Sequence, residues 1–201
     1  MAGGDRASFL SFEFRYDYEV EISPEFPGTG EWAETVHVFN DPRVAIQSSP
    51  SAEAAPLVVR VESADGGAWI GKFASGYSGI SGIYACPASD LICVIAGGCP
   101  YLVKSTQPEV GAVSPSDQVI QVLPSPDASL LFLVNYTDIV AIGKWGPLWN
   151  SGRLVLDNLR VVEIFDDEIH CLGTSSDLQE RKIIVDAANG SIKQGSVPGF
   201  S

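Results

Sequence analysis

The residues with the clearest potential for binding chemistry are an acidic triplet and a tryptophan. Asp166, Asp167 and Glu168 form the densest run of carboxylates in the chain. Such a run can ligate a hard cation or contact a basic partner. No D-x-D-x-D-G pattern surrounds it, however, and a plain polar turn is the alternative because Asp favours turns. Trp145 lies in the turn-like segment Gly-Lys-Trp-Gly-Pro, where a tryptophan offers a large, rigid contact surface. We take these four residues as the candidate partner-binding site; the alternative for Trp145 is folding back onto its own hairpin.

No catalytic constellation is visible in the sequence. His37 and His170 each lie within an alternating strand pattern, so we expect both on the polar face of their strands. His170 and Cys171 cannot act as a base and nucleophile pair, because adjacent strand residues face opposite sides of a sheet. The glycine pairs lack the following Lys-Ser/Thr of a phosphate loop, and no serine-hydrolase elbow is present. The sequence therefore nominates no catalytic residue, no metal ligand and no cofactor.

The four cysteines are expected to be buried, reduced thiols. Cys86, Cys93, Cys99 and Cys171 contain no C-x-x-C pair, which argues against a zinc knuckle or a thioredoxin-like motif. Buried cysteines commonly serve as small hydrophobic residues. A Cys86–Cys99 or Cys93–Cys171 disulfide is the alternative that the spacing leaves open.

The net charge of the chain limits the classes of partner that we expect it to bind. The 201 residues include 12 Lys and Arg against 25 Asp and Glu, a net charge of −13. This argues against binding to nucleic acid, which requires cationic side chains to displace counterions. It favours a basic protein partner, which an acidic surface attracts over long range. Besides the triplet, the acidic residues are dense near the N-terminus, at positions 13, 17, 19, 21, 25, 31 and 34.

Neither a secretory signal nor a membrane span is apparent. The first ten residues lack a basic segment followed by an apolar one. Apolar runs such as residues 130–134 are short, whereas a spanning helix needs about 20 apolar residues. We therefore expect a cytoplasmic protein without a membrane partner.

The elements that must position the candidate residues are short strands. Residues 12–22 alternate between apolar and polar side chains, which predicts one long, half-buried strand. Further strands are predicted at residues 35–39, 57–62, 68–73, 80–85, 91–96, 101–104, 119–123, 130–134, 139–143, 159–165, 168–172, 182–186 and 191–193. Helix signals are scarce, so we expect at least about 40% strand and under about 15% helix, far from the average composition. This pattern is typical of an all-β sandwich, barrel or propeller.

Two sets of regularly spaced residues indicate an internal repeat and support a propeller fold. Leu91, Leu130 and Ile169 each open a compact strand and are spaced 39 residues apart, so we expect them at equivalent, buried inner-strand positions. Strand–turn–strand segments begin at residues 61, 103, 142 and 185, with steps of 42, 39 and 43 residues. A unit of about 40 residues with four strands is the period of a propeller blade. Trp69 and Trp149 fall at matching repeat positions and are expected to pack between blades.

The turn segments also carry a resemblance to a known family. Val185-Asp-Ala-Ala-Asn-Gly190 resembles the strand–turn–strand signature of quinoprotein-type (PQQ-like) propeller repeats, and residues 61–69, with Trp69 closing the segment, are similar. Residues 142–149 have a shortened turn with Gly143 in the acidic position, and residues 103–110 keep neither the Asp nor the Gly. The resemblance implies blades of the PQQ-like or WD40-like kind. It does not imply quinone binding.

These observations predict one all-β domain over residues 1–201. Residues 1–34 form an N-terminal strand region, and residues 35–201 form a propeller-like array of about four repeats; a β-sandwich is the alternative. The expected function is a non-enzymatic acidic module that binds a protein partner, for example an inhibitor or immunity-type protein that masks a basic enzyme. The alternatives are a propeller that binds a small ligand or sugar, or is an enzyme, and a structural subunit of an assembly.

The strand pattern of residues 12–22 generates a first prediction. Removing residues 1–22 should lower the melting temperature of the whole domain, because the deleted segment has the alternation of a paired strand. Thermal unfolding followed by circular dichroism measures the effect. A truncated protein that melts like the parent would contradict the pairing.

Overall fold

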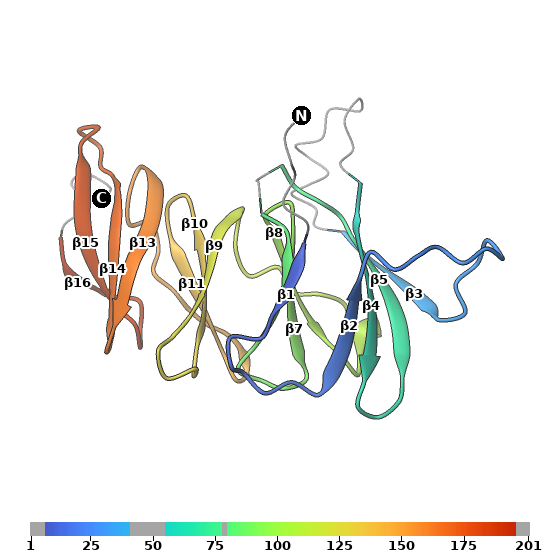
Figure 1. The fold of residues 1–201 in the computed structure, drawn as a ribbon. Coiled ribbons are helices and arrows are strands. Elements are labelled where there is room, and N and C mark those ends of the chain that lie inside the picture. Colours follow the sequence, from blue (N-terminus) through green and yellow to red (C-terminus); the bar gives the residue numbers. More distant parts are fainter. Residues whose placement is uncertain (1–6, 41–54, 78–79, 196–201) are drawn as a thin grey trace. The chain divides into compact units, whose positions relative to one another are not determined.

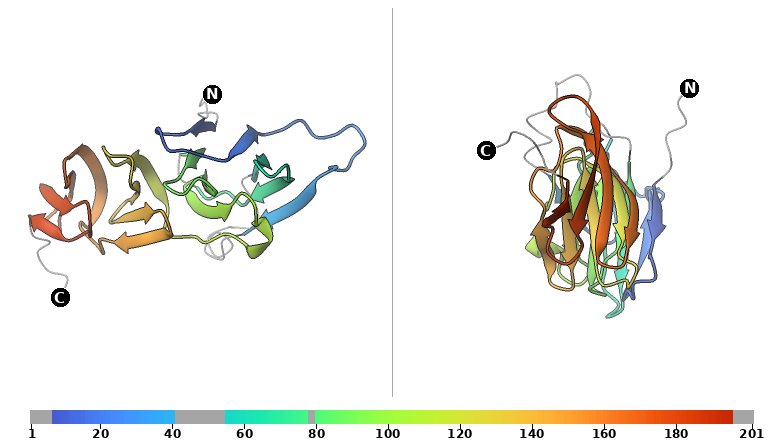
Figure 2. Two further views of the ribbon diagram at one scale, coloured as in Figure 1. Left: turned by 90° about the horizontal axis from the view of Figure 1, so that it is seen from below. Right: turned by 90° about the vertical axis from the view of Figure 1, so that its left-hand side faces the viewer.

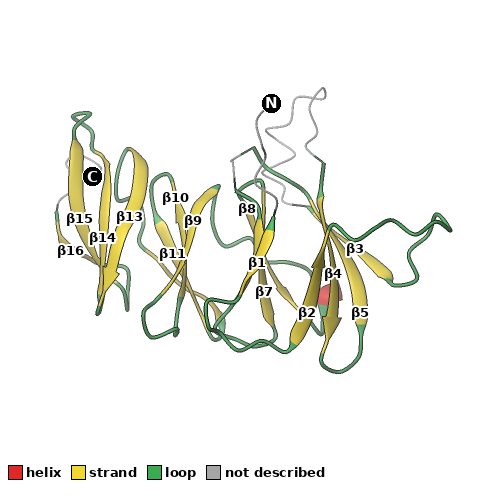
Figure 3. Ribbon diagram, in the orientation of Figure 1, coloured by secondary structure: helices red, strands yellow, loops and turns green. Residues whose placement is uncertain are grey.

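The chain is built almost wholly from β-strands. The computed structural model describes residues 7–40, 55–77 and 80–195. That part of the chain contains sixteen strands and a single 3-10 turn, η1 (Pro108–Val110), so the prediction of an all-β protein is confirmed (Figure 3). The strands form four separate four-stranded sheets. Two compact units, residues 1–118 and 119–201, contain two sheets each.

Unit 1 (residues 1–118) builds its sheets partly from strands distant in sequence. One sheet has the order β1-β6-β7-β8, and its N-terminal strand pairs in parallel with β6. The other has the order β2-β4-β5-β3, in which β3 pairs in parallel with β5 (Figure 1). The strands are β1 (Ser8–Leu10), β2 (Tyr18–Ile22), β3 (Thr35–Phe39), β4 (Leu57–Ser63), β5 (Ala68–Phe73), β6 (Gly82–Ala85), β7 (Leu91–Ala96) and β8 (Cys99–Lys104).

Unit 2 (residues 119–201) consists of two consecutive meanders. Both sheets follow chain order, β9-β10-β11-β12 and β13-β14-β15-β16, and all the pairs are antiparallel. Figure 2 shows these meanders along and across their strands. The strands are β9 (Val119–Pro124), β10 (Leu131–Asn135), β11 (Ile139–Gly143), β12 (Gly146–Asn150), β13 (Asp157–Phe165), β14 (Glu168–Thr174), β15 (Glu180–Asp186) and β16 (Ile192–Gln194).

Each unit has its own hydrophobic core shared by its two sheets. In unit 1 the core is aromatic: the Phe39 and Phe73 rings stack at 4.7 Å, and Tyr101 lies 5.4 Å from Phe73. Trp69 is buried, and its indole N–H donates to Ser105 O at 2.8 Å. In unit 2 the core is mainly aliphatic and includes the buried residues Phe132 and Ile169. Burial of a ring or branched side chain contributes about 1.5–3 kcal/mol, so these clusters stabilise each pair of sheets.

Three turns share a Ser-x-Asp motif that the repeat analysis missed. In each, the serine hydroxyl donates to the aspartate, whose carboxylate accepts the backbone N–H two residues later, and the intervening residue has a positive φ. The turns are Ser63–Asp65–Gly67, Ser125–Asp127–Ser129 and Ser175–Asp177–Gln179. These bonds hold the pKa of Asp177 at about 2, since the Ser175 hydroxyl and then Arg181 stabilise its carboxylate. The motif closes hairpins in both units.

The prediction of one strand over residues 12–22 is wrong. The structure starts β2 only at Tyr18, and Phe12 and Glu13 have φ of 50° and 67°. Phe14 N–H donates to Ser11 O at 2.9 Å, which closes a turn. The chain therefore leaves β1, reverses and enters β2, so Glu13 and Asp17 lie outside the strand that carries Glu19 and Glu21.

The repeat of Leu91, Leu130 and Ile169 identifies the correct strands. In two of them, however, the fully buried residue is the next one along the chain. Ile169 is fully buried on β14 as predicted, whereas Leu91 on β7 and Leu130 just before β10 are only half-buried. Their successors Ile92 and Leu131 are fully buried. A shift of one residue exchanges the two faces of a strand, and the turns before β7, β10 and β14 differ in length. The list of predicted strands lacks β12, although the strand–turn–strand segment that begins at residue 142 covers most of it.

Trp149 packs against the core of unit 2, beside the last hairpin turn. Its indole N–H donates to Ala187 O at 3.2 Å, and its ring lies 5.8 Å from Phe132. Gly190, with φ of 76°, leaves room for this ring, because a Cβ there would lie 2.6 Å from Trp149 Cε3. The glycine therefore serves both the turn conformation and the packing of Trp149.

A pair of glycine substitutions separates these two roles. Gly190→Ala should lower the free energy of unfolding by the cost of a left-handed alanine, about 1 kcal/mol, and by a further 1–3 kcal/mol, roughly, of overpacking against Trp149. Gly152→Ala is the matched control, because Gly152 has φ of 65° but nothing within 4 Å of its Cβ position. Urea unfolding measures both. Equal losses in the two variants would contradict the packing role.

Candidate functional site

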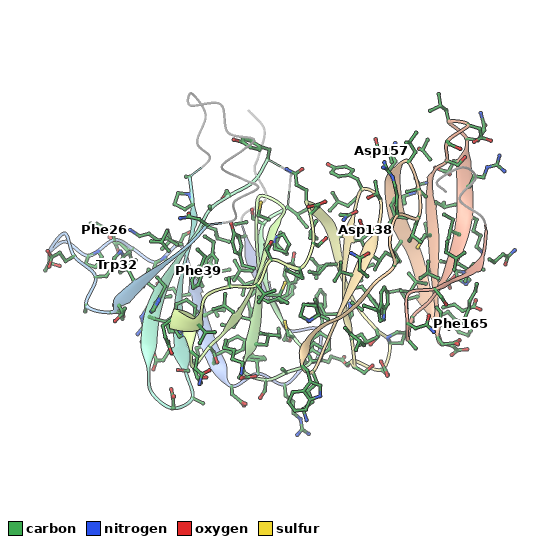
Figure 4. All side chains as sticks on the ribbon, turned by 180° about the vertical axis from the view of Figure 1, so that it is seen from behind. Phe26, Trp32, Phe39, Asp138, Asp157 and Phe165 are labelled. Carbon is green, nitrogen blue, oxygen red and sulfur yellow. The ribbon has the colours of Figure 1, made fainter. Side chains whose placement is uncertain are left out.

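The strand directions of unit 2 bring the candidate residues to one end. β13 begins beside the β10–β11 turn, because Leu154 N–H donates to Thr137 O and Leu159 N–H donates to Tyr136 O, at 2.8 and 3.0 Å. β13 then runs away from that turn, so the β11–β12, β13–β14 and β15–β16 turns lie at the opposite end (Figure 1). Figure 4 shows Asp157, where β13 begins, at one end of the unit and Phe165, where β13 ends, at the other. Trp145 and the acidic triplet therefore share one end of unit 2.

Trp145 is almost fully exposed at the tip of the β11–β12 hairpin. Its exposed fraction is 92%, so it does not fold back onto its own hairpin. Gly146, with φ of 103°, makes the tight turn that presents the ring. Lys144 Nζ lies 5.4 Å from the ring centroid, a cation–π contact worth about 0.5–1 kcal/mol at an exposed position. The ring is therefore accessible, and the role of Trp145 in binding a partner stays a prediction.

The acidic triplet forms the β13–β14 turn, and Lys193 offsets part of its charge. Asp167 contacts Lys193 Nζ at 2.6 Å, and Glu168 contacts His170 Nε2 at 3.0 Å. Lys193 also lies 3.8 Å from Glu168 and 3.5 Å from Asp186. The hydrogen bond from Lys193 holds the pKa of Asp167 below its usual value. Asp166, with φ of 51°, is exposed and is the triplet residue without an ion pair in the described chain.

Two exposed apolar residues at this end were not predicted. Phe165 is 61% exposed and Leu148 is 59% exposed. A β-bulge places two residues of β13 against one of β14 between Val161 and Glu163, which changes the face on which the following residues lie. Phe165 therefore points outward with Glu168, although uninterrupted alternation from Leu159 would turn it inward. We call Trp145, Leu148, Phe165 and Asp166 the turn surface of unit 2.

The remaining chemical candidates are structural. His170 lies on the polar face between Glu163 and Glu168, as predicted. The prediction for His37 is wrong: its ring faces Trp69 and Phe39, at 5.8 and 6.3 Å, because edge strand β3 turns its valines outward.

The four cysteines are buried, and none forms a disulfide. Burial raises the pKa of the Cys93 and Cys171 thiols to about 12, so these groups are poor nucleophiles near neutral pH. Within the described ranges, no group of three or more His, Cys, Asp or Glu residues is placed to hold a metal ion. The same part of the chain has no helix long and apolar enough to cross a membrane.

Comparison with known proteins identifies no family. No family model matches the chain, and no curated protein matches it. Among solved structures, the crystal structure of the N-terminal domain of Nup159 is similar, with a TM-score of 0.39 and 10% sequence identity. The match covers 96% of this chain and 54% of that one, so the chain spans about half the length of the structure it matches.

The network around Lys193 generates a pH-dependent prediction. A lowered pKa for Asp167 stabilises the fold above the usual aspartate range, and this stabilisation is lost as the pH falls through the folded pKa. Lys193→Met should therefore raise the pKa of Asp167 towards its usual 3.8 and reduce the stability lost between neutral pH and about pH 3. Carboxyl NMR titration and urea unfolding measure the two effects.

Lys182→Met is the matched control, because Lys182 is exposed on β15 of the same sheet and has no ion pair in the described chain. An unchanged Asp167 pKa in Lys193→Met, or an equal change in Lys182→Met, would contradict the assignment of Lys193 as the partner of Asp167.

Proposed function

We propose that the protein is a non-enzymatic interaction module that binds a protein partner through the turn surface of unit 2. The observation that carries this proposal is the 92% exposure of Trp145 on a hairpin that a second sheet supports through Trp149 and Ala187. Exposure of a large indole ring to water is unfavourable. Tryptophan is also enriched among the residues that dominate binding energy at protein interfaces. Leu148 and Phe165 add apolar surface at the same end.

The partner of this module has a basic contact surface. Asp166 is exposed in the β13–β14 turn, and the chain carries a net charge of −13, which speeds the approach of cationic proteins. The contribution of the triplet is smaller than its charge implies, since Lys193 neutralises part of it. An apolar centre with an acidic rim fits a contact in which Trp145 supplies affinity and charge supplies the association rate.

The module is a propeller-like array in which each four-stranded sheet is one blade. The consecutive antiparallel meanders β9–β12 and β13–β16 support this, because a blade is a meander of four strands. Unit 1 departs from that pattern through its parallel pairs β1–β6 and β3–β5. Two sheets around one core in each unit also fit a sandwich. An experimental structure with the Cα trace of all four sheets separates the two architectures.

The test of the proposed function compares three immobilised proteins as baits for extracts of the native host. Trp145→Ala should reduce retention of the specific partner at least about tenfold, as expected for a central hot-spot residue. Leu178→Ala is the matched control, because Leu178 is 73% exposed on the β14–β15 turn at the other end of unit 2. Mass spectrometry quantifies the retained proteins. If every retained protein binds the parent and Trp145→Ala equally, the turn surface is not the binding site.

A further inference from the structure

Strand β3 lies at one edge of its sheet in unit 1 and has a free side. Among the described residues it pairs with β5 alone, in parallel (Figure 1). In a parallel ladder, the backbone N–H and C=O groups of successive residues point to opposite sides of the strand. Phe39 O accepts the N–H of Ala74 at 3.0 Å, so residues 35, 37 and 39 face β5. The backbone groups of Val36 and Val38 therefore point away from the sheet.

The free side of β3 offers polar and apolar groups together. No hydrogen bond from the backbone of Val36 or Val38 occurs in the part of the chain that the structure describes. Both side chains are also exposed, Val36 by 37% and Val38 by 63%, because they lie on the face opposite to His37 and Phe39. Two N–H donors, two C=O acceptors and two valine side chains are thus available to another strand.

The edge of β3 lacks the features with which proteins commonly block strand pairing. Such features are charged side chains, proline, bulges, very short strands and cover by another segment. The sequence of β3 is Thr-Val-His-Val-Phe, which contains no carboxylate, lysine, arginine or proline. Each other edge strand of the described sheets has at least one of these features: β1 and β16 have three residues, β2 has two glutamates, β8, β9 and β12 contain proline, and β13 is bulged.

We propose that β3 pairs in antiparallel orientation with β3 of a second copy of this chain, about a two-fold axis at His37. In that register, Val36 of each copy lies opposite Val38 of the other. Opposite residues of a hydrogen-bonded antiparallel pair exchange both N–H···O=C bonds, so the two valine pairs make four bonds and use all the free groups of Val36 and Val38.

The strand itself specifies a second copy as the occupant, because its two free residues are symmetric about His37 and both are valine. Their four side chains would meet on one face of the joined sheets, where apolar β-branched pairs stabilise a ladder. An axis at Val36 would instead place Glu34 opposite Val38. Glu34 is already held by Arg60 at 2.7 Å on its own sheet. The register centred on His37 therefore brings no carboxylate into the pairing.

The dimer is expected to be weak and to depend on salt. A single strand pair buries less surface than the roughly 1,200–2,000 Å² of a stable interface. Each copy also carries a net charge of −13, so the two copies repel one another until salt screens their charge. This interface lies in unit 1 and involves no residue of the turn surface, so it stands or falls separately from the proposed function.

Sedimentation velocity on the full chain, at concentrations up to about 1 mM, tests the self-association. The parent should shift from monomer towards dimer as concentration and salt rise. Val38→Lys should weaken the association at least about tenfold, because a lysine on an edge strand opposes pairing. Val38→Pro should weaken it similarly, since proline removes an N–H that points away from β5 and spares the ladder of the sheet. Circular dichroism melting checks that both variants are folded.

Val162→Lys is the matched control, because Val162 is 52% exposed on the edge strand β13 of unit 2. It should associate like the parent. A parent chain that stays monomeric at about 1 mM overturns the proposal and leaves the edge to a strand of a different protein. Equal weakening by Val162→Lys and Val38→Lys also overturns it.

Disulfide cross-linking tests the register without depending on the valine variants. Residues at position 37 of the two copies would form a non-hydrogen-bonded pair with Cα atoms about 4.5 Å apart, within the range of a disulfide. His37→Cys should therefore form a covalent dimer in oxidised glutathione, whereas Thr35→Cys should not, because Thr35 lies opposite Phe39. The four native cysteines are buried. Equal cross-linking of the two variants, or none in His37→Cys, contradicts the axis at His37.

Discussion

Gln121 makes the interaction on which the geometry of unit 2 depends. Its side-chain carbonyl accepts the N–H of Val161 at 2.9 Å, and its amide donates to Val161 O at 3.4 Å. Val161 adjoins the bulge of β13, where the ladder is interrupted and backbone groups lack a partner on β14. The amide side chain of Gln121 on β9 therefore provides hydrogen-bond partners for backbone groups at the bulge, and it links the two sheets of unit 2. The bulge in turn directs Phe165 outward, beside the acidic turn.

The acidic side chains of this protein form local clusters and do not make a uniformly negative surface. At the β13–β14 turn, Lys193 lies among the carboxylates of Asp167, Glu168 and Asp186 and offsets part of their charge. On the paired strands β2 and β4 of unit 1, Glu19 lies in register with Glu62, and Arg60 pairs with both Glu62 and Glu34. The net charge of the chain does not reveal these ion pairs. Each cluster contains a single cation that is shared by two or more carboxylates.

The alternation and turn signals in the sequence predicted most strands, because burial of one face imposes a period of two on the side chains. They failed where the backbone departs from that period. Phe12 and Glu13 adopt positive φ and break the apparent strand of residues 12–22. The bulge at Val161 places Phe165 on the face opposite to the one that alternation predicts, and no residue type in β13 indicates the bulge. Trp145 was predictable because its flanking Gly and Pro mark a turn, whereas the ion pairs of Asp167 and Glu168 depend on Lys193 and His170, whose positions are set by strand register.

The contrast in connectivity between the units has a kinetic consequence. Every sheet pairing in unit 2 joins strands that follow one another along the chain, so its loops close at low entropic cost. Unit 1 must instead join Ser8 to Gly82 and Thr35 to Trp69 through parallel pairs. Low contact order accelerates folding, and pairing between distant segments slows it. We therefore expect the C-terminal unit to acquire its structure first after dilution from denaturant, with the N-terminal strands docking in a later, slower phase.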